Sequence, residues 1–447
     1  MISRRHFLGA TGSLSAASLL GGVSIPGQAA GEGYRALVVV YLNGGNDGNN
    51  VLVPTDGAYG DYQTSRANLA LPRSSLATLS GSAAGHTFGL HASLTPLVPL
   101  YNSGRLGFIS NVGPLVEPAT GRQVLDNAVR LPPFLMSHSD QTAVVQGWNM
   151  AEDNSGWAGR GLETLPISLR HPLSAVTMDT NRTLVLGKQS TVTFMPPGGT
   201  RWWGTADLAY PETPAAQSLT RMARWQSANA YEAEYARTLG SALYDSTQLT
   251  QAFLRAQASS ADFGNDWLGN NMRALSSVLP YFKAQGLKRQ VFLNHWGGFD
   301  THANQRGADM NTQDAQLVTL ARVLEAFDAT NRANGMDMNV VTLVMTEFGR
   351  TLRPGSGGGS EHAWGNHWWL MGGPVAGGTV HGVFPSMVLG GPDDGDPGKN
   401  GRHVPSTSSD QVGASLMQWL GMESSHLLDV FPNLANFKQK TLPLIRI

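Results

Sequence analysis

Short apolar runs alternate with longer amphipathic segments along most of this chain. Several apolar runs are rich in valine, leucine and isoleucine and end in a polar or glycine-rich stretch, which is typical of buried parallel strands followed by loops. Two of the longer segments repeat apolar residues every three or four positions, as helices packed on a sheet do. We predict strands at 35–42, 106–110, 183–186, 291–294 and 339–346, and helices at 213–244, 271–285 and 312–334.

The alternation of strands and helices predicts an α/β fold. Its central sheet is expected to be mostly parallel and covered by helices on both faces, as a three-layer αβα sandwich. The sequence contains no internal repeat and no long linker, and 355–359 is a short glycine-rich loop. We therefore predict one domain over residues 31–447, with an irregular helical insertion at about 150–270.

The first thirty residues have the pattern of a twin-arginine export signal. Arg4 and Arg5 precede a moderately apolar stretch, and small residues around Ala29 fit a signal-peptidase site. The stretch is less apolar than the roughly 20 residues that a membrane-spanning helix needs. We expect residues 1–30 to be a signal peptide recognised by the twin-arginine translocase, and the mature chain to be periplasmic or secreted.

Composition narrows the range of functions. The chain has no cysteine, so neither disulfides nor thiolate metal ligands are available. Its net charge is −1 with no basic stripe, which argues against nucleic-acid binding, and no apolar run after the signal is long enough to cross a membrane. The charged fraction of 14% is low against about a quarter in typical domains, which favours a loop-rich enzyme with a polar site.

Acids and histidines follow the ends of the predicted strands. Ligand sites of parallel α/β sheets lie at the carboxyl ends of the strands, so these side chains are expected to converge. Carboxylates and imidazoles suit divalent zinc, manganese, iron or calcium. Because six side chains exceed the needs of one tetrahedral zinc, we predict two metal ions. The predicted ligands are Asp47, Asp300, His302, Glu347, His362 and His367.

A serine at the start of a predicted helix is the candidate nucleophile. Metal coordination can activate the hydroxyl of Ser137, and His138 and Arg350 complete the predicted catalytic set. Arg350, together with Asn46 and Asn304, is expected to contact the oxyanion. No G-x-S-x-G elbow, Walker A sequence or G-x-G-x-x-G after a strand is present, which disfavours α/β-hydrolase and nucleotide-dependent chemistry.

Each candidate also has a purely structural interpretation. Asp47 could form an Asx turn, Ser137 could cap a helix, and Glu347 could pair with Arg350. The late histidines, His362 and His367, lie among tryptophans and could be packed in the core. The shared position of the acids after apolar strands favours a functional site over these separate explanations.

Several segments resemble one exported bacterial family, in the same order along nearly the whole mature chain. They include YLNGGNDGNNVLVP, SHSDQ, GWAGR, GGFDTHANQ, VVTLVMTEFGRT and EHAWGNHWW. The family is domain-of-unknown-function family 1501, which is placed in the alkaline phosphatase/sulfatase superfamily. The resemblance implies an alkaline-phosphatase-like central sheet with a two-metal site. It implies that Asp47, Ser137 and Glu347 hold one metal, and that Asp300, His302 and His362 hold the other, with His367 as a substitute.

The sequence departs from the superfamily pattern at two places. Phe348 stands where the pattern has a ligand histidine, and the absence of cysteine removes the usual sulfatase nucleophile. We therefore expect an exported metal-dependent hydrolase of phosphate or sulfate esters, small or polymeric. The alternative is a non-catalytic exported binding protein for a polysaccharide or protein partner, which Phe348 and the eleven tryptophans would suit.

Overall fold

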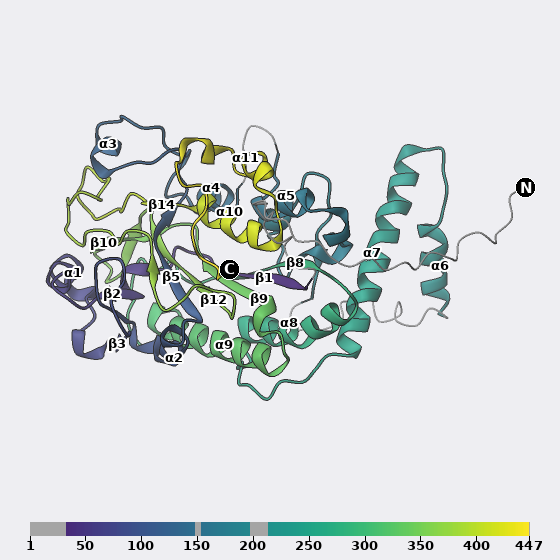
Figure 1. Ribbon diagram of the computed structural model, residues 1–447, viewed down its shortest axis with the longest axis horizontal. Helices are drawn as coiled ribbons and strands as arrows, with labels where there is room; N and C mark the ends of the chain where they lie inside the picture. Colours follow the sequence, from purple (N-terminus) through teal and green to yellow (C-terminus); the bar gives the residue numbers. More distant parts are fainter. Residues whose placement is uncertain (1–32, 148–152, 197–212, 447) are drawn as a thin grey trace, which may run out of the picture. The chain divides into compact units, whose positions relative to one another are not determined.

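A mixed sheet of nine strands forms the centre of the fold, in a computed structural model that describes residues 33–147, 153–196 and 213–446 (Figure 1). The strand order is β13-β5-β12-β9-β1-β8-β6-β7, with β14 paired to β5, and only β12 runs antiparallel to its neighbours. The bounds are β1 Arg35–Leu42, β5 Leu106–Gly113, β6 Ala175–Thr177, β7 Thr193–Phe194, β8 Arg289–Trp296, β9 Val340–Met345, β12 Asn366–Met371, β13 Val380–His381 and β14 Thr407–Ser408.

Helices and two small sheets surround this centre. The helices are α1 Tyr59–Arg66, α2 Val98–Asn102, α3 Gly121–Leu125, α4 His138–Val145, α5 Trp157–Thr164, α6 Pro214–Ala223, α7 Ala230–Leu254, α8 Trp267–Ala284, α9 Gln313–Ala333, α10 Ser409–Leu420 and α11 Leu427–Val430. One small sheet joins β2 Leu52–Pro54, β4 Phe88–Leu90 and β3 Ala77–Thr78, and the other pairs β10 Arg350–Pro354 with β11 Ser360–His362.

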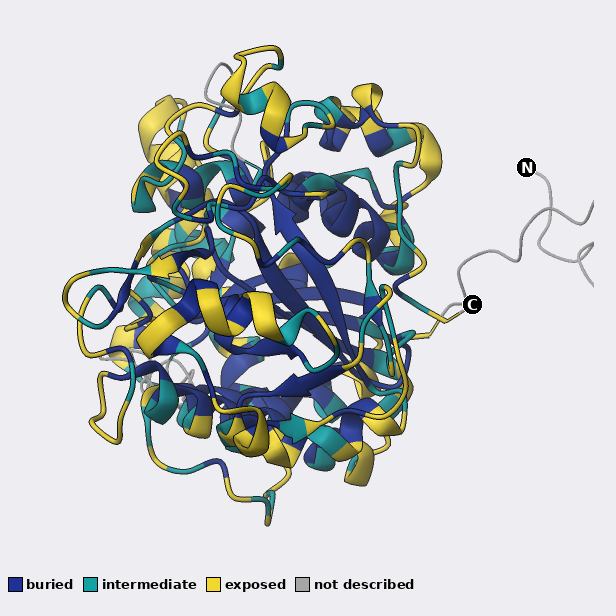
Figure 2. Ribbon diagram, turned by 90° about the vertical axis from the view of Figure 1, so that its left-hand side faces the viewer, coloured by how far each residue is buried: buried dark blue, intermediate teal, exposed yellow. Residues whose placement is uncertain are grey.

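The central strand β1 is buried on both faces, which explains its unbroken apolar sequence. Val38 and Val40 belong to the apolar cluster that includes α8 and α9, whereas Leu37 and Val39 belong to the cluster that includes α5 and α10. Figure 2 shows the buried strands enclosed by helices whose outer sides are exposed. Burial of each such side chain contributes about 1.5–3 kcal/mol to the free energy of unfolding. The predicted α/β sandwich with a mostly parallel sheet is confirmed.

Two predicted elements differ in the structure. Thr183–Val185 forms a 3₁₀ turn instead of a strand. The helix predicted at 213–244 is interrupted, because α6 ends at Ala223 and Asn229 caps a new helix by accepting hydrogen bonds from two backbone N–H groups of α7. Asparagine favours this capping role over a helix interior, since its side chain competes for backbone hydrogen bonds. The segment predicted as an insertion also supplies β6 and β7 to the edge of the main sheet.

Three neighbouring parallel strands, β9, β1 and β8, end at the same edge of the sheet. The loops that follow them carry Asp47, Asp300 and Glu347, so the topology brings the predicted acids to one edge. None of the helices in the described part of the chain is long and apolar enough to span a membrane. The predicted signal peptide, residues 1–30, lies outside the described residues.

Candidate metal centre

The loop after β1 approaches the loop after β8 so closely that it requires glycine. Gly44 has φ +114°, and a Cβ at this position would lie 2.3 Å from the backbone nitrogen of Asp300. A Cβ on Gly45, which has φ +75°, would lie 2.3 Å from the ring of Phe348. Only glycine adopts this backbone region without strain and leaves room for both neighbours. The glycine run in the sequence therefore packs the edge of the sheet at which Asp300 lies.

Three histidines surround the carboxylate of Asp300. The Nε2 atoms of His302 and His362 lie 3.0 and 3.2 Å from its Oδ1 atom, and the Nε2 atom of His138 lies 3.3 Å from Oδ2. The Nε2 atoms of His302 and His362 are 3.0 Å apart. The four side chains come from α4, from β11 and from the loop after β8, so they converge only in the folded chain. His138, which the sequence suggested as a catalytic partner of Ser137, thus lies among the candidate metal ligands.

The opposite ring nitrogen of each histidine contacts a hydrogen-bond acceptor. The Nδ1 atom of His138 lies 2.9 Å from Oε1 of Glu347, and that of His302 lies 2.7 Å from Oε2 of Glu361. The Nδ1 atom of His362 lies 2.8 Å from the carbonyl oxygen of Met136. Since these oxygens accept from an imidazole, each Nδ1–H can donate to one of them, and a ring that is neutral in this tautomer presents an unprotonated Nε2.

The resulting arrangement fits a cation. In this tautomer the Nε2 lone pairs of His302 and His362 lie 3.0 Å apart, and all three Nε2 atoms lie near the Asp300 carboxylate, which is unfavourable unless a proton or a metal cation lies between them. Ligand atoms of His138, Asp300 and His362 all lie within 4.8 Å of one another. In metal sites, the ring nitrogen of a ligand histidine that does not contact the metal regularly donates to an acceptor, which fixes the orientation of the imidazole. A set of three nitrogens and one carboxylate suits zinc, manganese or iron better than calcium, which prefers oxygen ligands.

The charges around Asp300 keep it ionised. Burial alone would raise the pKa of Asp300, but the hydrogen bond and charge of Arg350, together with His362 and His302, lower that pKa to about 2. Burial and the nearby Arg350 charge lower the pKa of His362, which favours its neutral form. The hydrogen bond to Glu347 raises the pKa of His138 against the effect of burial. The centre thus keeps an anionic ligand beside at least one neutral imidazole, as metal coordination requires.

A strained turn delivers His138 and the Met136 carbonyl to the centre. Phe134 and Met136 have φ of 52° and 69°, a region that non-glycine residues seldom adopt. The side chain of Gln141 holds this turn, because it accepts from the Met136 backbone N–H at 2.7 Å and donates to the Glu347 carbonyl at 2.8 Å. The local strain is therefore compensated by hydrogen bonds that also fix the position of α4 relative to Glu347.

Arg350 supports the centre from inside the protein. Its side chain has 0% exposure, and its guanidinium donates to the carbonyls of Gly45 and Ser360 at 2.8 and 2.9 Å. It also donates to the Gly44 carbonyl and pairs with the carboxylate of Asp300. These contacts occupy the guanidinium with protein groups, so the structure assigns Arg350 to positioning Asp300. The oxyanion contact predicted for Arg350 has no support in this geometry.

Asp47 does not join the histidine cluster. Its carboxylate is completely buried, pairs with Arg66 of α1 and accepts a hydrogen bond from Gln305 at 2.6 Å. Its other oxygen accepts from the backbone N–H of Asn49 at 3.1 Å, which is the Asx turn that its sequence context allowed. The structure therefore places Asp47 in a buried ion pair and not among the histidines, and its metal role stays a prediction.

The other two predicted ligands also lie outside the centre. Glu347 is buried and stands behind His138, and its carboxylate also accepts from the backbone N–H of Gly44 at 2.8 Å. His367 lies on β12, accepts from the backbone N–H of Asn111 at 3.2 Å and stacks on Phe384 with ring centroids 5.0 Å apart. Burial lowers the pKa of His367 to about 3. The structure therefore places His367 in the core, which is the structural alternative to the ligand role predicted for it.

The predicted nucleophile is at the rim. Ser137 occupies the N-cap position of α4 without a capping hydrogen bond, and its hydroxyl donates to Asp140 instead. The neighbouring cleft has a volume of ≈ 580 Å³ and includes His138, Ser139, Asp300 and Glu347 among its lining residues. The side chains predicted to bind the oxyanion with Arg350 diverge. Asn46 is buried and accepts from Gln313 at 3.1 Å, whereas Asn304 is exposed.

Phe348 packs against two of the histidines of the centre, at a position where the superfamily pattern has a ligand histidine. Its buried ring lies 4.6 Å from the ring of His362 and 4.9 Å from that of His138, measured between centroids. This contact restricts the orientation of both imidazoles. Two supporting groups escaped the sequence analysis, Glu361 and the Met136 carbonyl. Glu361 directly precedes a predicted ligand, which was a usable signal, whereas a backbone carbonyl leaves no trace in the sequence.

Two solved structures resemble this chain only weakly. The chain resembles the lipoteichoic acid synthase LtaP from Listeria monocytogenes at 9% identity and a TM-score of 0.34, covering 90% of this chain and 76% of that one. It resembles Ps i-CgsB in complex with k-i-k-neocarrahexaose at 10% identity and a TM-score of 0.32, covering 92% and 77%. Likenesses this weak carry no argument about chemistry, and no curated protein shows significant sequence similarity.

The resemblance noted from the sequence motifs is confirmed by a family model that spans most of the chain. The matched residues, 34–391, include all strands and loops that build the centre around Asp300. The chain therefore belongs to the family described as "protein of unknown function (DUF1501)".

Proposed function

We propose that this protein is an exported metal-dependent hydrolase of phosphate or sulfate esters that binds one divalent transition-metal ion. Its ligands are His138, His302, His362 and Asp300. The observation that carries the proposal is the convergence of three Nε2 atoms on one carboxylate, with each opposite Nδ1 held by an acceptor. The proposal thus takes one centre of four side chains, whereas the sequence led us to expect two metal ions.

The residues around this site have different roles in the proposal. Glu347, Glu361 and the Met136 carbonyl orient the three imidazoles, and Arg350 holds the Asp300 carboxylate ionised. A divalent ion bound by this set supplies a Lewis acid that polarises an ester oxygen. The described residues that line the cleft include no lysine or arginine. Attraction for an anionic ester therefore has to come from the bound cation.

The neutral side chains of the cleft are suited to hold the rest of the substrate. Asn43, Ser139, Thr142 and Asn181 line it and can donate or accept hydrogen bonds. Ser139 lines the cleft together with His138, and Ser137 lies next to His138 in the sequence, so a serine nucleophile remains part of the proposal. Export by the twin-arginine route is also proposed, on the strength of Arg4, Arg5, the apolar stretch that follows them and the small residues around Ala29.

Metal analysis of the purified mature chain tests the proposal. We expect one zinc, manganese or iron ion per chain, and hydrolysis of an aryl phosphate, a phosphodiester or an aryl sulfate that chelation removes and the same metal restores. A His302→Ala chain should lose both metal and activity. His86→Ala is the matched control, because His86 pairs with Asp56 away from the centre and should leave both unchanged. A chain that binds no metal would sink the proposal, and metal without hydrolysis would favour the binding-protein alternative.

A substitution of Glu361 tests whether the acceptors behind the histidines support metal binding. Replacing it by glutamine removes the negative charge behind His302, whose Nδ1 lies 2.7 Å from the carboxylate. Changes of this kind weaken metal binding by about 10- to 100-fold. We expect that loss in a competition titration with a coloured chelator, with no change in the metal stoichiometry at saturation.

The control for this variant is Glu234→Gln, an exposed carboxylate that pairs with Arg237 on α7. It should leave the affinity unchanged. Equal affinities for Glu361→Gln and the unsubstituted chain would show that His302 does not contact the metal through Nε2.

A further inference from the structure

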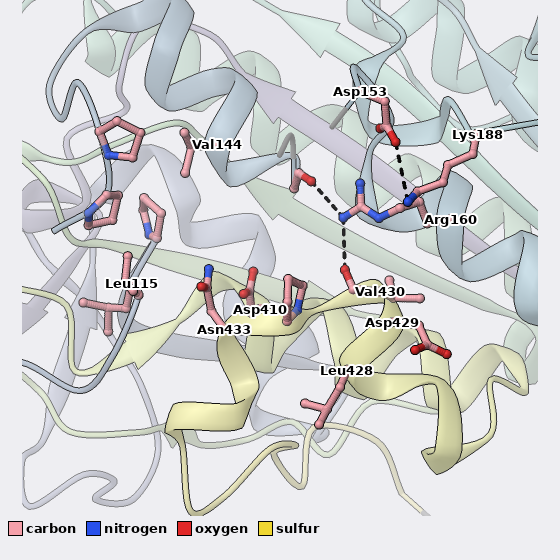
Figure 3. Close-up of a pocket in the computed structure, with 16 residues that line it drawn as sticks. Leu115, Val144, Asp153, Arg160, Lys188, Asp410, Leu428, Asp429, Val430 and Asn433 are labelled. Carbon is pink, nitrogen blue, oxygen red and sulfur yellow. Dashed lines mark hydrogen bonds and ion pairs between the residues drawn. The ribbon is translucent and has the colours of Figure 1, made fainter. Parts of the chain in front are cut away.

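A second cavity of ≈ 640 Å³ lies outside the metal centre and shares no residue with it (Figure 3). It lies among α4, α5, α10 and the segment around α11. Its walls combine charged and polar side chains with an aliphatic part formed by Leu115, Pro132, Pro133, Val144 and Leu428. A pocket of this size with an apolar wall and a few converging polar groups is the usual form of a small-molecule site.

Asp410 and Asn433 form a polar pair at the floor of the cavity. Figure 3 shows these two side chains next to each other and directed into the cavity. Burial raises the pKa of Asp410 to about 6, against the opposing effects of the Arg160 charge and a hydrogen bond from Asn433. Once the Asn433 amide donates to Asp410, the amide oxygen and the remaining carboxylate lone pairs are left to accept. The floor of the cavity therefore presents mainly hydrogen-bond acceptors.

The positively charged side chains around the cavity already contact oxygen atoms of the protein. Arg160 donates to the carbonyls of Ser155, Gly147 and Val430 at 2.7, 2.8 and 3.0 Å, and Lys188 lies 3.6 Å from Asp153. Figure 3 shows the guanidinium of Arg160 directed to the Val430 carbonyl. At the rim, the Asp429 carboxylate lies 3.1 Å from the Nδ1 atom of His426 and is 71% exposed, so it does not belong to the proposed site. The floor of the cavity is consequently better prepared for a donor-rich, positively charged head group than for an anion.

We propose that this cavity binds a primary amine carried on a short aliphatic body. The ammonium group has three donors and no acceptor, which matches the Asp410 carboxylate and the Asn433 amide oxygen. The methylene groups would pack against the prolines and leucines of the wall and displace water from them. The proposal does not depend on the metal centre or on ester hydrolysis.

Replacing Asp410 by asparagine removes the charge and keeps the shape of the side chain. Because the folded state raises the pKa of Asp410, its contribution to stability is full below the ordinary pKa and is lost as the pH rises through about 6. Asp410→Asn should therefore fold, with a Tm higher than that of the unsubstituted chain by roughly 2–5 °C at pH 8. The difference should shrink as the pH is lowered to 5, and thermal melts at the two pH values check this.

Calorimetric titration with n-hexylamine at pH 7.5 tests the proposed ligand class, with 1-hexanol and hexanoate as probes of equal length. We expect hexylamine to bind at one site per chain, more tightly than either of the others. Asp410→Asn should weaken it by at least about tenfold, the loss of one charge-assisted pair. Asp429→Asn, the matched carboxylate at the rim, should have no effect, and Val144→Trp, which fills the cavity, should abolish binding. Absence of binding, equal binding of hexanol, or no effect of Asp410→Asn would overturn the proposal.

Discussion

An Asp300→Asn chain is expected to lose its bound metal and nearly all of its hydrolytic activity. Asp300 is the one carboxylate that all three histidines face, at 3.0 to 3.3 Å from their Nε2 atoms. An amide in its place lacks the negative charge and turns a hydrogen-bond donor or a weak carbonyl ligand toward the cation. We expect metal affinity to fall by more than the roughly 10- to 100-fold that loss of an outer partner costs.

The same substitution should do little to the metal-free protein. Asp300 neutralises the buried Arg350, but its own side chain is 45% exposed, so solvent screens the pair. We expect a destabilisation of about 1 kcal/mol or less, as for other partly exposed ion pairs. Metal content by elemental analysis and urea unfolding with and without chelator separate the two effects. An Asp300→Asn chain that still binds a stoichiometric metal would show that the histidine cluster is not the metal centre.

An Asp47→Asn chain is expected to behave in the opposite way, with metal retained and stability lost. Asp47 and Arg66 form an ion pair in which both side chains have 0% exposure. Removing one member leaves the other charge buried without its partner, which typically costs about 3–5 kcal/mol. The free energy of unfolding should fall by that amount in urea, while the metal stoichiometry of the folded fraction stays unchanged.

A double variant provides the control for this prediction. Asp47→Asn combined with Arg66→Met removes both charges, and replacement of a buried pair by neutral groups is often close to neutral for stability. We therefore expect the double variant to recover a large part of the loss. The opposite result, in which Asp47→Asn loses metal at unchanged stability, would restore Asp47 to the ligand set expected from the sequence.

The fold was largely predictable because its signals are local. The alternation along β1 places successive residues on opposite faces, and apolar residues at every position can only mean that both faces are covered. The predicted bounds of β1 agree with the structure, and α9 begins at Gln313 and ends at Ala333 close to the predicted 312–334. Thr183–Val185 shows the limit of such signals, because an apolar run of three or four residues fits a strand and a tight turn equally well.

The sequence predicted where the candidate site lies, but it did not predict which side chains come together there. Asp47, Asp300 and Glu347 follow adjacent parallel strands, so their common edge follows from topology. The direction in which each carboxylate points depends on partners far away in the chain. Arg66 captures Asp47, and the backbone N–H of Gly44 helps to hold Glu347 behind His138.

The sequence by itself determined the class of fold, the edge of the sheet at which the acids meet, and the oxygen and nitrogen character of the candidate donors, since apolar periodicity and residue type express these directly. Only the tertiary structure decided which donors meet. His138 reaches Asp300 because a strained turn before α4 is held by Gln141, whereas His367 is turned into the core on β12. The physical reason is that a metal site requires atoms within a few ångströms of one another, and long-range packing, with no trace in local sequence, sets such distances.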